Sequence, residues 1–209
     1  MNNEADSTGQ PSERDTSLDE RDRADTARLA AGNDASLNDL MERHAERLFL
    51  YLVRSLQGEQ DAADLAQETF VRVYQNRAKF RPDAKFSTWL YTIASNLVKT
   101  RYRFRSRHAE VSLDAEIEQS GHSFRDSLPE HTPTPSDRLQ TDERADAVRR
   151  AVAALPEELR IPLILAEYEE RSQAEIGEIL KCSAKAVETR IYRARQQLRV
   201  TLGKLLEGV

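Results

Sequence analysis

The chain has 209 residues, with 31 basic and 36 acidic side chains and a net charge of −5. No apolar run approaches the roughly 20 residues that cross a bilayer, and the polar N-terminus lacks the apolar core of a signal peptide, so we expect a cytoplasmic protein. The single cysteine, Cys182, excludes a disulfide framework, and the four histidines lack metal-ligand spacing. We expect neither a metal nor another cofactor.

The charge is arranged in alternating blocks. Residues 1–36 carry 4 basic and 9 acidic side chains, residues 37–108 carry 13 and 8, and residues 109–141 carry 2 and 7. The last part of the chain divides again, with a net −5 over residues 142–180 and +5 over residues 181–209. Asymmetry of this kind indicates contact with nucleic acid.

Residues 1–36 are rich in acidic and small polar side chains, and Leu18 and Leu29 are almost their only large apolar ones. Such a stretch buries too little surface to offset its chain entropy. We expect a disordered or marginally helical acidic extension, which would act as a regulatory arm if it masked the basic faces of the protein.

Residues 37–108 show the 3.6-residue apolar periodicity of amphipathic helices. A first helix ends near Gly58, a second begins about Asp61, and a third begins at Phe86 after a loop at residues 80–85. These helices predict one small all-α domain.

Residues 109–141 contain Pro129, Pro133 and Pro135 and have almost no periodicity, which predicts a flexible acidic linker. Helical periodicity returns in residues 142–209, and the sequence shows neither strand alternation nor tandem repeats. The expected fold class is all-α, with two small helical domains joined by the linker.

The C-terminal block has the pattern of a helix-turn-helix. Ser172 and Glu175 form a capping box, Gly177 leaves room for a crossing helix, and residues 181–183 make a turn before a longer helix. The outward positions of that helix are polar: Lys185, Glu188, Thr189, Tyr192, Arg193 and Arg199. The pattern favours binding in the DNA major groove over the alternative, a solvated basic face on an ordinary helical hairpin.

The end of the N-terminal block is also basic. Five cations occur between Lys99 and Arg107, and they cannot all share one helix face, so a polyanion-binding surface and a merely solvated helix end are both open. Aromatic residues cluster just upstream, where single-stranded bases could stack. For Phe86 and Trp89 the helical spacing favours core packing.

Three motifs in family order carry a resemblance: DLAQETF at residues 64–70, KFSTWLYTIASN at residues 85–96, and VETRIYRAR at residues 187–195. Together they resemble the bacterial sigma-70 family, and most closely its extracytoplasmic-function (ECF) group. The resemblance covers about residues 37–108, as sigma region 2, and 142–205, as region 4. It implies a region 2 domain of three or four helices and a region 4 helix-turn-helix domain that extends to residue 209.

The resemblance implies three binding surfaces. The surface for core RNA polymerase comprises Asp64, Gln67 and Glu68. The surface that captures and melts the −10 element comprises Phe80, Arg81, Lys85, Phe86, Trp89, Asn96, Lys99 and Arg103. The surface that reads the −35 element comprises Lys185, Glu188, Thr189, Arg190, Tyr192 and Arg193. Two positions depart from the family pattern: Glu188 replaces a frequent Arg or Lys, and Glu170 replaces a frequent Gly.

The implied function is a transcription initiation factor that binds core polymerase, directs it to promoters and aids melting, without catalytic residues of its own. Its implied partners are core polymerase, promoter DNA and an anti-sigma factor that is often membrane-bound, with no membrane insertion by this chain. The main alternative is a stand-alone helix-turn-helix regulator, which would bind palindromic DNA without polymerase. A helical protein-interaction adaptor would show no dependence on DNA.

Overall fold

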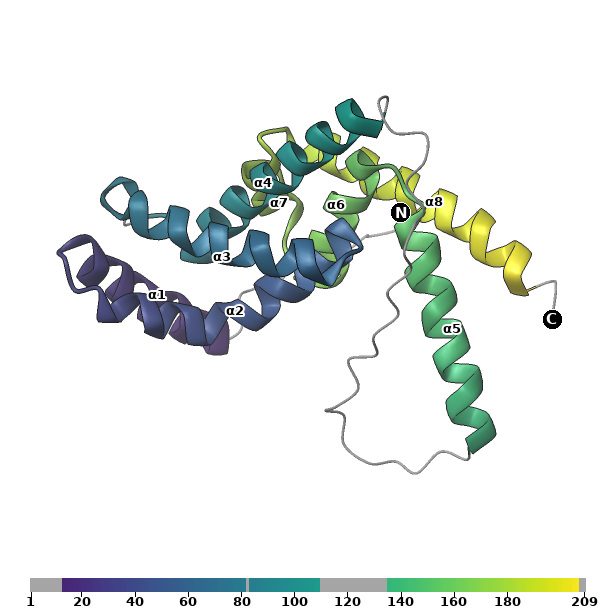
Figure 1. The fold of residues 1–209 in the computed structure, drawn as a ribbon, viewed down its shortest axis with the longest axis horizontal. Coiled ribbons are helices and arrows are strands. Elements are labelled where there is room, and N and C mark those ends of the chain that lie inside the picture. Colours follow the sequence, from purple (N-terminus) through teal and green to yellow (C-terminus); the bar gives the residue numbers. More distant parts are fainter. Residues whose placement is uncertain (1–12, 82, 110–134, 207–209) are drawn as a thin grey trace, which may run out of the picture.

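The computed structural model describes residues 13–81, 83–109 and 135–206, and these residues form helices and connecting turns with no β-strand. The expected all-α class is confirmed (Figure 1). None of the helices in these ranges has the length and hydropathy needed to cross a membrane. The elements are α1 (Glu13–Ala30), α2 (Ala35–Leu56), α3 (Glu59–Gln75), the 3-10 helix η1 (Arg77–Lys79), α4 (Phe86–Ala109), α5 (Pro135–Ala153), α6 (Glu157–Glu167), α7 (Gln173–Leu180) and α8 (Ala184–Leu206).

Helices α2, α3 and α4 form the core of the N-terminal unit, as the apolar periodicity predicts. The α2 helix ends where Gln57 adopts a left-handed conformation, with φ 63°, and its N–H bonds to the Val53 carbonyl. Tyr51 and Leu52 are fully buried, and Leu90 on α4 is 1 % exposed. Burial of these apolar side chains fixes how the three helices pack.

The expectation of a disordered or marginally helical N-terminus is wrong for residues 13–30, which form α1 against α2 (Figure 1). Leu29 is fully buried, and Asp22 and Asp25 are 1 % and 3 % exposed. Asp22 accepts from Arg43 Nε at 2.9 Å and lies 2.6 Å from His44 Nε2. Polar pairing and one leucine therefore anchor a helix whose composition is mostly hydrophilic. Residues 1–12 lie outside the described ranges.

Helices α5 to α8 form the C-terminal unit. The α5 helix begins at Pro135, so residues 135–141 of the expected linker are helical, and the helix extends away from the rest of the chain (Figure 1). A proline early in a helix costs little, because the first N–H groups have no partner in the helix. The α6 helix follows Pro156 directly. The linker residues 110–134 lie outside the described ranges.

The two units share one apolar core. Buried side chains of α2 and α4 belong to the same cluster as those of α6, α7 and α8, and α4 packs directly against α7. Tyr91 of α4 and Ile164 of α6 are 2 % and 0 % exposed. The N-terminal half of α4 is therefore covered by the C-terminal unit.

Candidate nucleic-acid interface

The turn between α7 and α8 has the geometry that the sequence indicates. Ser172 Oγ accepts from the Glu175 N–H at 3.2 Å, and the Glu175 carboxylate accepts from the Ser172 N–H at 3.0 Å, which completes the capping box. A Cβ at Gly177 would lie 2.7 Å from the backbone oxygen of Cys182. Ser183 caps α8 through the Ala186 N–H at 3.2 Å. These contacts fix α8 relative to α7.

The outer face of α8 is open to solvent. The side chains of Lys185 and Glu188 are 80 % and 50 % exposed, and the Lys185 Nζ atom lies 3.1 and 2.9 Å from the two Glu188 carboxylate oxygens. Tyr192 is 63 % exposed, and Thr189 and Arg193 are exposed beside it. Five of the six residues expected at the −35 element therefore lie on one accessible helix face, which suits insertion into a major groove.

The sixth residue, Arg190, lies elsewhere. It is half-buried, and its Nη1 atom lies 3.6 Å from Cys182 Sγ. Both residues line a cavity of about 570 Å³ between the units. Lys99 and Arg103 of α4, two residues expected at the −10 element, line the same cavity.

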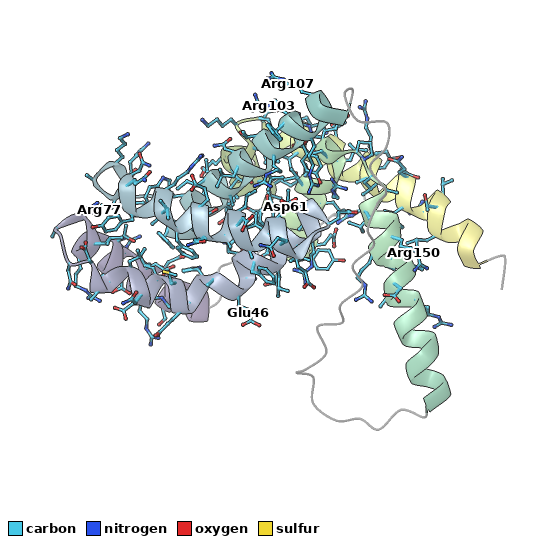
Figure 2. All side chains as sticks on the ribbon, viewed as in Figure 1. Glu46, Asp61, Arg77, Arg103, Arg107 and Arg150 are labelled. Atoms are coloured by element: carbon cyan, nitrogen blue, oxygen red, sulfur yellow. The ribbon has the colours of Figure 1, made fainter. Side chains whose placement is uncertain are left out.

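The basic run at the end of α4 divides into two sets. Arg101 and Arg105 both bind the carboxylate of Asp61 on α3. Arg103 is exposed, and Figure 2 shows it with Arg107 toward the C-terminal end of α4. Because two cations are neutralised within the chain, only part of the run can attract phosphates.

The aromatic cluster upstream is mainly structural. Phe86 is 2 % exposed and packs against Phe80 and Trp89 at centroid distances of 6.4 and 6.2 Å. The core therefore encloses the Phe86 ring in this conformation, and its contact with the −10 element stays a prediction. Phe80 and Trp89 are half-buried and retain accessible surface, and their ring centroids lie 5.2 Å apart.

The polar residues around this cluster are also engaged. Lys85 Nζ lies 3.0 Å from Glu175 Oε1 of α7 and 3.6 Å from Asp19 Oδ2 of α1, and the bond to Glu175 raises the pKa of Lys85. Arg81 pairs with Asp83 at 2.6 Å on the exposed loop, which lowers the pKa of Asp83. Among the residues expected at the −10 element, Asn96 is exposed on α4.

The three residues expected at core polymerase lie on α3. Asp64 and Gln67 are exposed, and Glu68 is half-exposed with its carboxylate 2.8 Å from Arg72 Nε. Their spacing at i, i+3 and i+4 places them on one helix face. That face remains accessible while the two units are packed together.

Sequence reasoning missed the residues that tie the two units together. The hydroxyl of Tyr91 donates to Glu169 Oε2 at 2.5 Å, and Glu169 is 2 % exposed. Arg171 Nη1 donates to Ser87 Oγ at 3.1 Å. Arg160 binds the Tyr102 hydroxyl. Apolar periodicity does not detect such pairs, although three charged residues in a row at positions 169–171, before a capping box, were an available sign.

Comparison with known proteins gives consistent matches in both units. The profile of sigma-70 region 2 matches residues 40–108, and that of sigma-70 region 4 matches residues 145–198. The RNA polymerase sigma-H factor of Pseudomonas aeruginosa is 31% identical over 191 residues, which cover 90% of this chain and 96% of that protein. This chain belongs to the sigma-70 family. The ECF RNA polymerase sigma factor SigW of Bacillus subtilis is 33% identical over 83% of this chain and 92% of its own length, in keeping with the ECF group.

Two solved structures have similar folds. CnrH, in complex with the cytosolic domain of CnrY, has 28% sequence identity and a TM-score of 0.63, covering 88% of this chain and 98% of CnrH. The sigma factor RpoE of Bartonella quintana, in complex with the anti-sigma factor NepR, has 20% identity and a TM-score of 0.63, covering 79% of this chain and 96% of RpoE. Both likenesses cover most of this chain and nearly the whole of the similar protein.

Proposed function

We propose that this ECF sigma factor binds core RNA polymerase and brings it to promoters through separate contacts with the −35 and −10 elements. The observation that carries the proposal is the accessible outer face of α8, which is held by a capped helix-turn-helix. On this face, the base-reading candidates are Lys185, Glu188, Thr189, Tyr192 and Arg193. Arg190 can join them only by leaving the cavity between the units.

For the −10 element, the exposed candidates are Arg81, Asn96 and Arg103, with Lys85 and Lys99 at the boundary between the units. Phe80 and Trp89 would offer stacking surface to an unstacked base, and their ring contacts would offset part of the cost of a few kcal/mol of unstacking. Phe86 would support those two rings from the core.

Core polymerase would dock on the face of α3 formed by Asp64, Gln67 and Glu68. A surface of carboxylates and an amide fits a basic partner surface. The chain itself would supply binding energy and orientation, whereas polymerase would supply the chemistry. Such a factor acts in the cytoplasm, where the polymerase is.

The proposal also includes an anti-sigma factor as a regulatory partner. CnrH, which resembles this chain over most of its length, was solved with the cytosolic domain of a second protein, CnrY. A comparable protein would inhibit this chain by covering its polymerase or promoter surfaces.

The test is transcription from a promoter library with purified core polymerase and the full chain. Specific run-off transcripts that require both components are the expected result. Binding to palindromic DNA without polymerase, and no transcripts with it, would instead identify a stand-alone helix-turn-helix regulator. The variant Asp64→Lys should lose polymerase binding, and Asp39→Lys, at an exposed position on α2, is its charge-matched control.

A further inference from the structure

The cavity between the units is lined by basic groups from both sides. Its volume of about 570 Å³ lies between α4, the start of α6 and the turn that joins α7 to α8. Small-molecule sites in proteins have volumes of about 300 to 1,000 Å³. Four basic side chains line this cavity: Lys99, Arg103, Lys181 and Arg190.

These four cations keep their charge available. In the described part of the chain, none of them forms an ion pair with a carboxylate, although Arg101 and Arg105 of α4 both bind Asp61. Residues that alternate along one helix therefore differ, because Arg101 and Arg105 are neutralised within the chain and Lys99 and Arg103 are not. The cavity offers positive charge that an anion can neutralise.

Two carboxylates also line the cavity. Glu157 and Glu158 begin α6, so four basic and two acidic side chains leave the lining with a net charge of +2. Burial raises the pKa of Glu157, and the nearby Lys99 and Arg103 act in the opposite direction. A carboxylate accepts hydrogen bonds from hydroxyl and amino groups, so a fitting ligand carries such donors beside its anionic group.

The remaining lining is apolar and forms a floor beneath these charges. Ile161 and Pro162 of α6 are buried, and Leu180 at the end of α7 is 7 % exposed. A flat apolar ring placed on these side chains would remove water from both surfaces. The lining therefore combines a site for anionic groups, acceptors for hydroxyl or amino groups, and an apolar surface for a ring.

Lys181 shows that promoter contacts do not account for the whole cavity. It ends α7 in the left-handed conformation, with φ 56°, which glycine adopts at a lower cost. Its side chain is exposed and lines the cavity, and it belongs to none of the three surfaces that the family resemblance implies.

From this lining we propose that the cavity binds a nucleotide that carries two or more phosphates. The phosphates bind the four cations, because guanidinium and ammonium groups make charge-assisted hydrogen bonds to phosphate oxygens. The sugar hydroxyls or the amino group of the base donate to Glu157 and Glu158, and the base lies on the apolar floor. Binding at this site goes beyond the proposed function and involves neither promoter DNA nor polymerase.

Cys182 gives a direct measure of occupancy in the unmodified chain. It is the only cysteine, it is half-buried, and it lines the cavity. ATP at about four times its dissociation constant should slow alkylation of this thiol by N-ethylmaleimide about fivefold, because only the free fraction reacts. Sodium sulfate at the same ionic strength should give no such protection. Equilibrium dialysis with ATP measures the dissociation constant independently.

A matched pair of variants locates the bound ATP. Lys181→Gln should weaken ATP binding about tenfold, which is the usual effect of losing one charge-assisted hydrogen bond. Lys79→Gln makes the same chemical change at an exposed position on η1, outside the cavity, and should leave ATP binding unchanged. Thermal unfolding without ATP shows whether both variants keep the stability of the wild-type chain.

Inorganic tripolyphosphate separates a nucleotide site from a general anion site. It carries the phosphates without the base, so it should bind about fivefold more weakly than ATP. Equal affinity for the two ligands would overturn the assignment of a nucleotide. Absence of ATP binding by dialysis, or an equal loss of affinity in Lys181→Gln and Lys79→Gln, would overturn the site itself. Run-off transcription tests the proposed function separately, so either idea can fail without the other.

Discussion

The two proposed DNA surfaces of this sigma factor differ in how much of each is available in the free chain. On α8, Tyr192 and Arg193 are exposed, and Lys185 and Glu188 pair with each other. On the −10 side, Lys85 is bound by Glu175 and Asp19, and Phe86 is buried. The −35 surface is therefore ready to bind, whereas the −10 surface is partly occupied by the chain itself.

The difference follows from how each surface is built. The α8 face is formed by one helix, so local capping and an apolar inner face are sufficient to present it. The −10 surface is formed by a loop and a helix that also support the contact between the units. A surface that shares residues with an internal contact can be regulated through that contact.

The largest expected effect comes from disrupting the turn between α7 and α8, which supports the −35 surface. Gly177→Ala places a methyl group 2.7 Å from the Cys182 carbonyl oxygen, in a turn where only backbone could give way. We expect a loss of about 3 kcal/mol in the free energy of unfolding, with loss of −35 binding. Chemical denaturation measures the free energy of unfolding, and fluorescence anisotropy measures binding to the −35 element.

The control for this substitution is Gly203→Ala on α8, where nothing lies within 4 Å of the added methyl group. That change should stabilise the helix by up to about 1 kcal/mol, because alanine is the better helix former. Equal destabilisation by the two substitutions would remove the steric explanation.

The next largest effect concerns the stability of the core near the −10 surface and its dependence on pH. Burial raises the pKa of Tyr51 to about 12, against a partly offsetting hydrogen bond with Ser95. The folded chain keeps this phenol neutral more strongly than the unfolded chain does. The stabilisation is therefore complete below about pH 10 and is lost as the pH rises to about 12, with roughly 2 to 3 kcal/mol at stake.

Denaturation between pH 8 and 12 measures how steeply the free energy of unfolding falls as the pH rises. Tyr51→Phe should make the unfolding free energy less dependent on pH above 10, at a cost of about 1 kcal/mol at neutral pH for the lost hydrogen bond with Ser95. The control is Tyr192→Phe at an exposed site. An unchanged slope in Tyr51→Phe would show that this phenol does not set the alkaline limit of stability.

A smaller effect tests the −35 surface on α8 directly. Arg193→Ala should reduce transcription that depends on the −35 element. If the side chain reads a base, the loss corresponds to about 1 to 3 kcal/mol of binding free energy. Arg199→Ala, farther along the same helix and also exposed, is the charge-matched control and should act mainly through its general attraction for phosphates. An equal loss from templates that lack a −35 element would contradict base reading by Arg193.

The smallest effect concerns cations that the −10 side neutralises internally. Asp61→Asn would release Arg101 and Arg105, which the Asp61 carboxylate binds in the wild-type chain. Because these groups are only partly buried, we expect less than about 1 kcal/mol of lost stability and a two- to threefold gain in DNA affinity at low salt. The gain should disappear as salt is raised. No gain at low salt would show that these two arginines do not face the DNA.

Local chemistry decided which elements could be predicted from sequence. The capping box at Ser172, the crossing at Gly177 and the outward residues of α8 all follow from spacing within one hairpin, and the structure has them as expected. The α1 helix was missed because its inward positions, Asp22, Asp25, Thr26 and Leu29, have helical spacing but include only one apolar side chain. A periodicity of hydropathy cannot detect a helix that is anchored mainly by ion pairs.

The contact between the units could not be predicted for a related reason. Tyr91 and Glu169 are 78 positions apart in the chain, and neither forms part of a local motif that requires the other. The residues for core polymerase and for the two promoter elements came from family resemblance, and they stay predictions in need of the experiments above. The geometry refines them by enclosing Phe86 and by turning Arg190 toward the cavity.

The close approach at Gly177 also has a mechanical consequence. Because Gly177 has no side chain, α7 packs closely against the turn that leads into α8. The α8 helix has 23 residues and is about 35 Å long. A tilt of about 10° at α7 would move the far end of α8 by roughly 6 Å, more than the rise of one base pair. Because Glu175 caps the start of α7 and pairs with Lys85, the direction of α8 depends on contacts made at its partner helix.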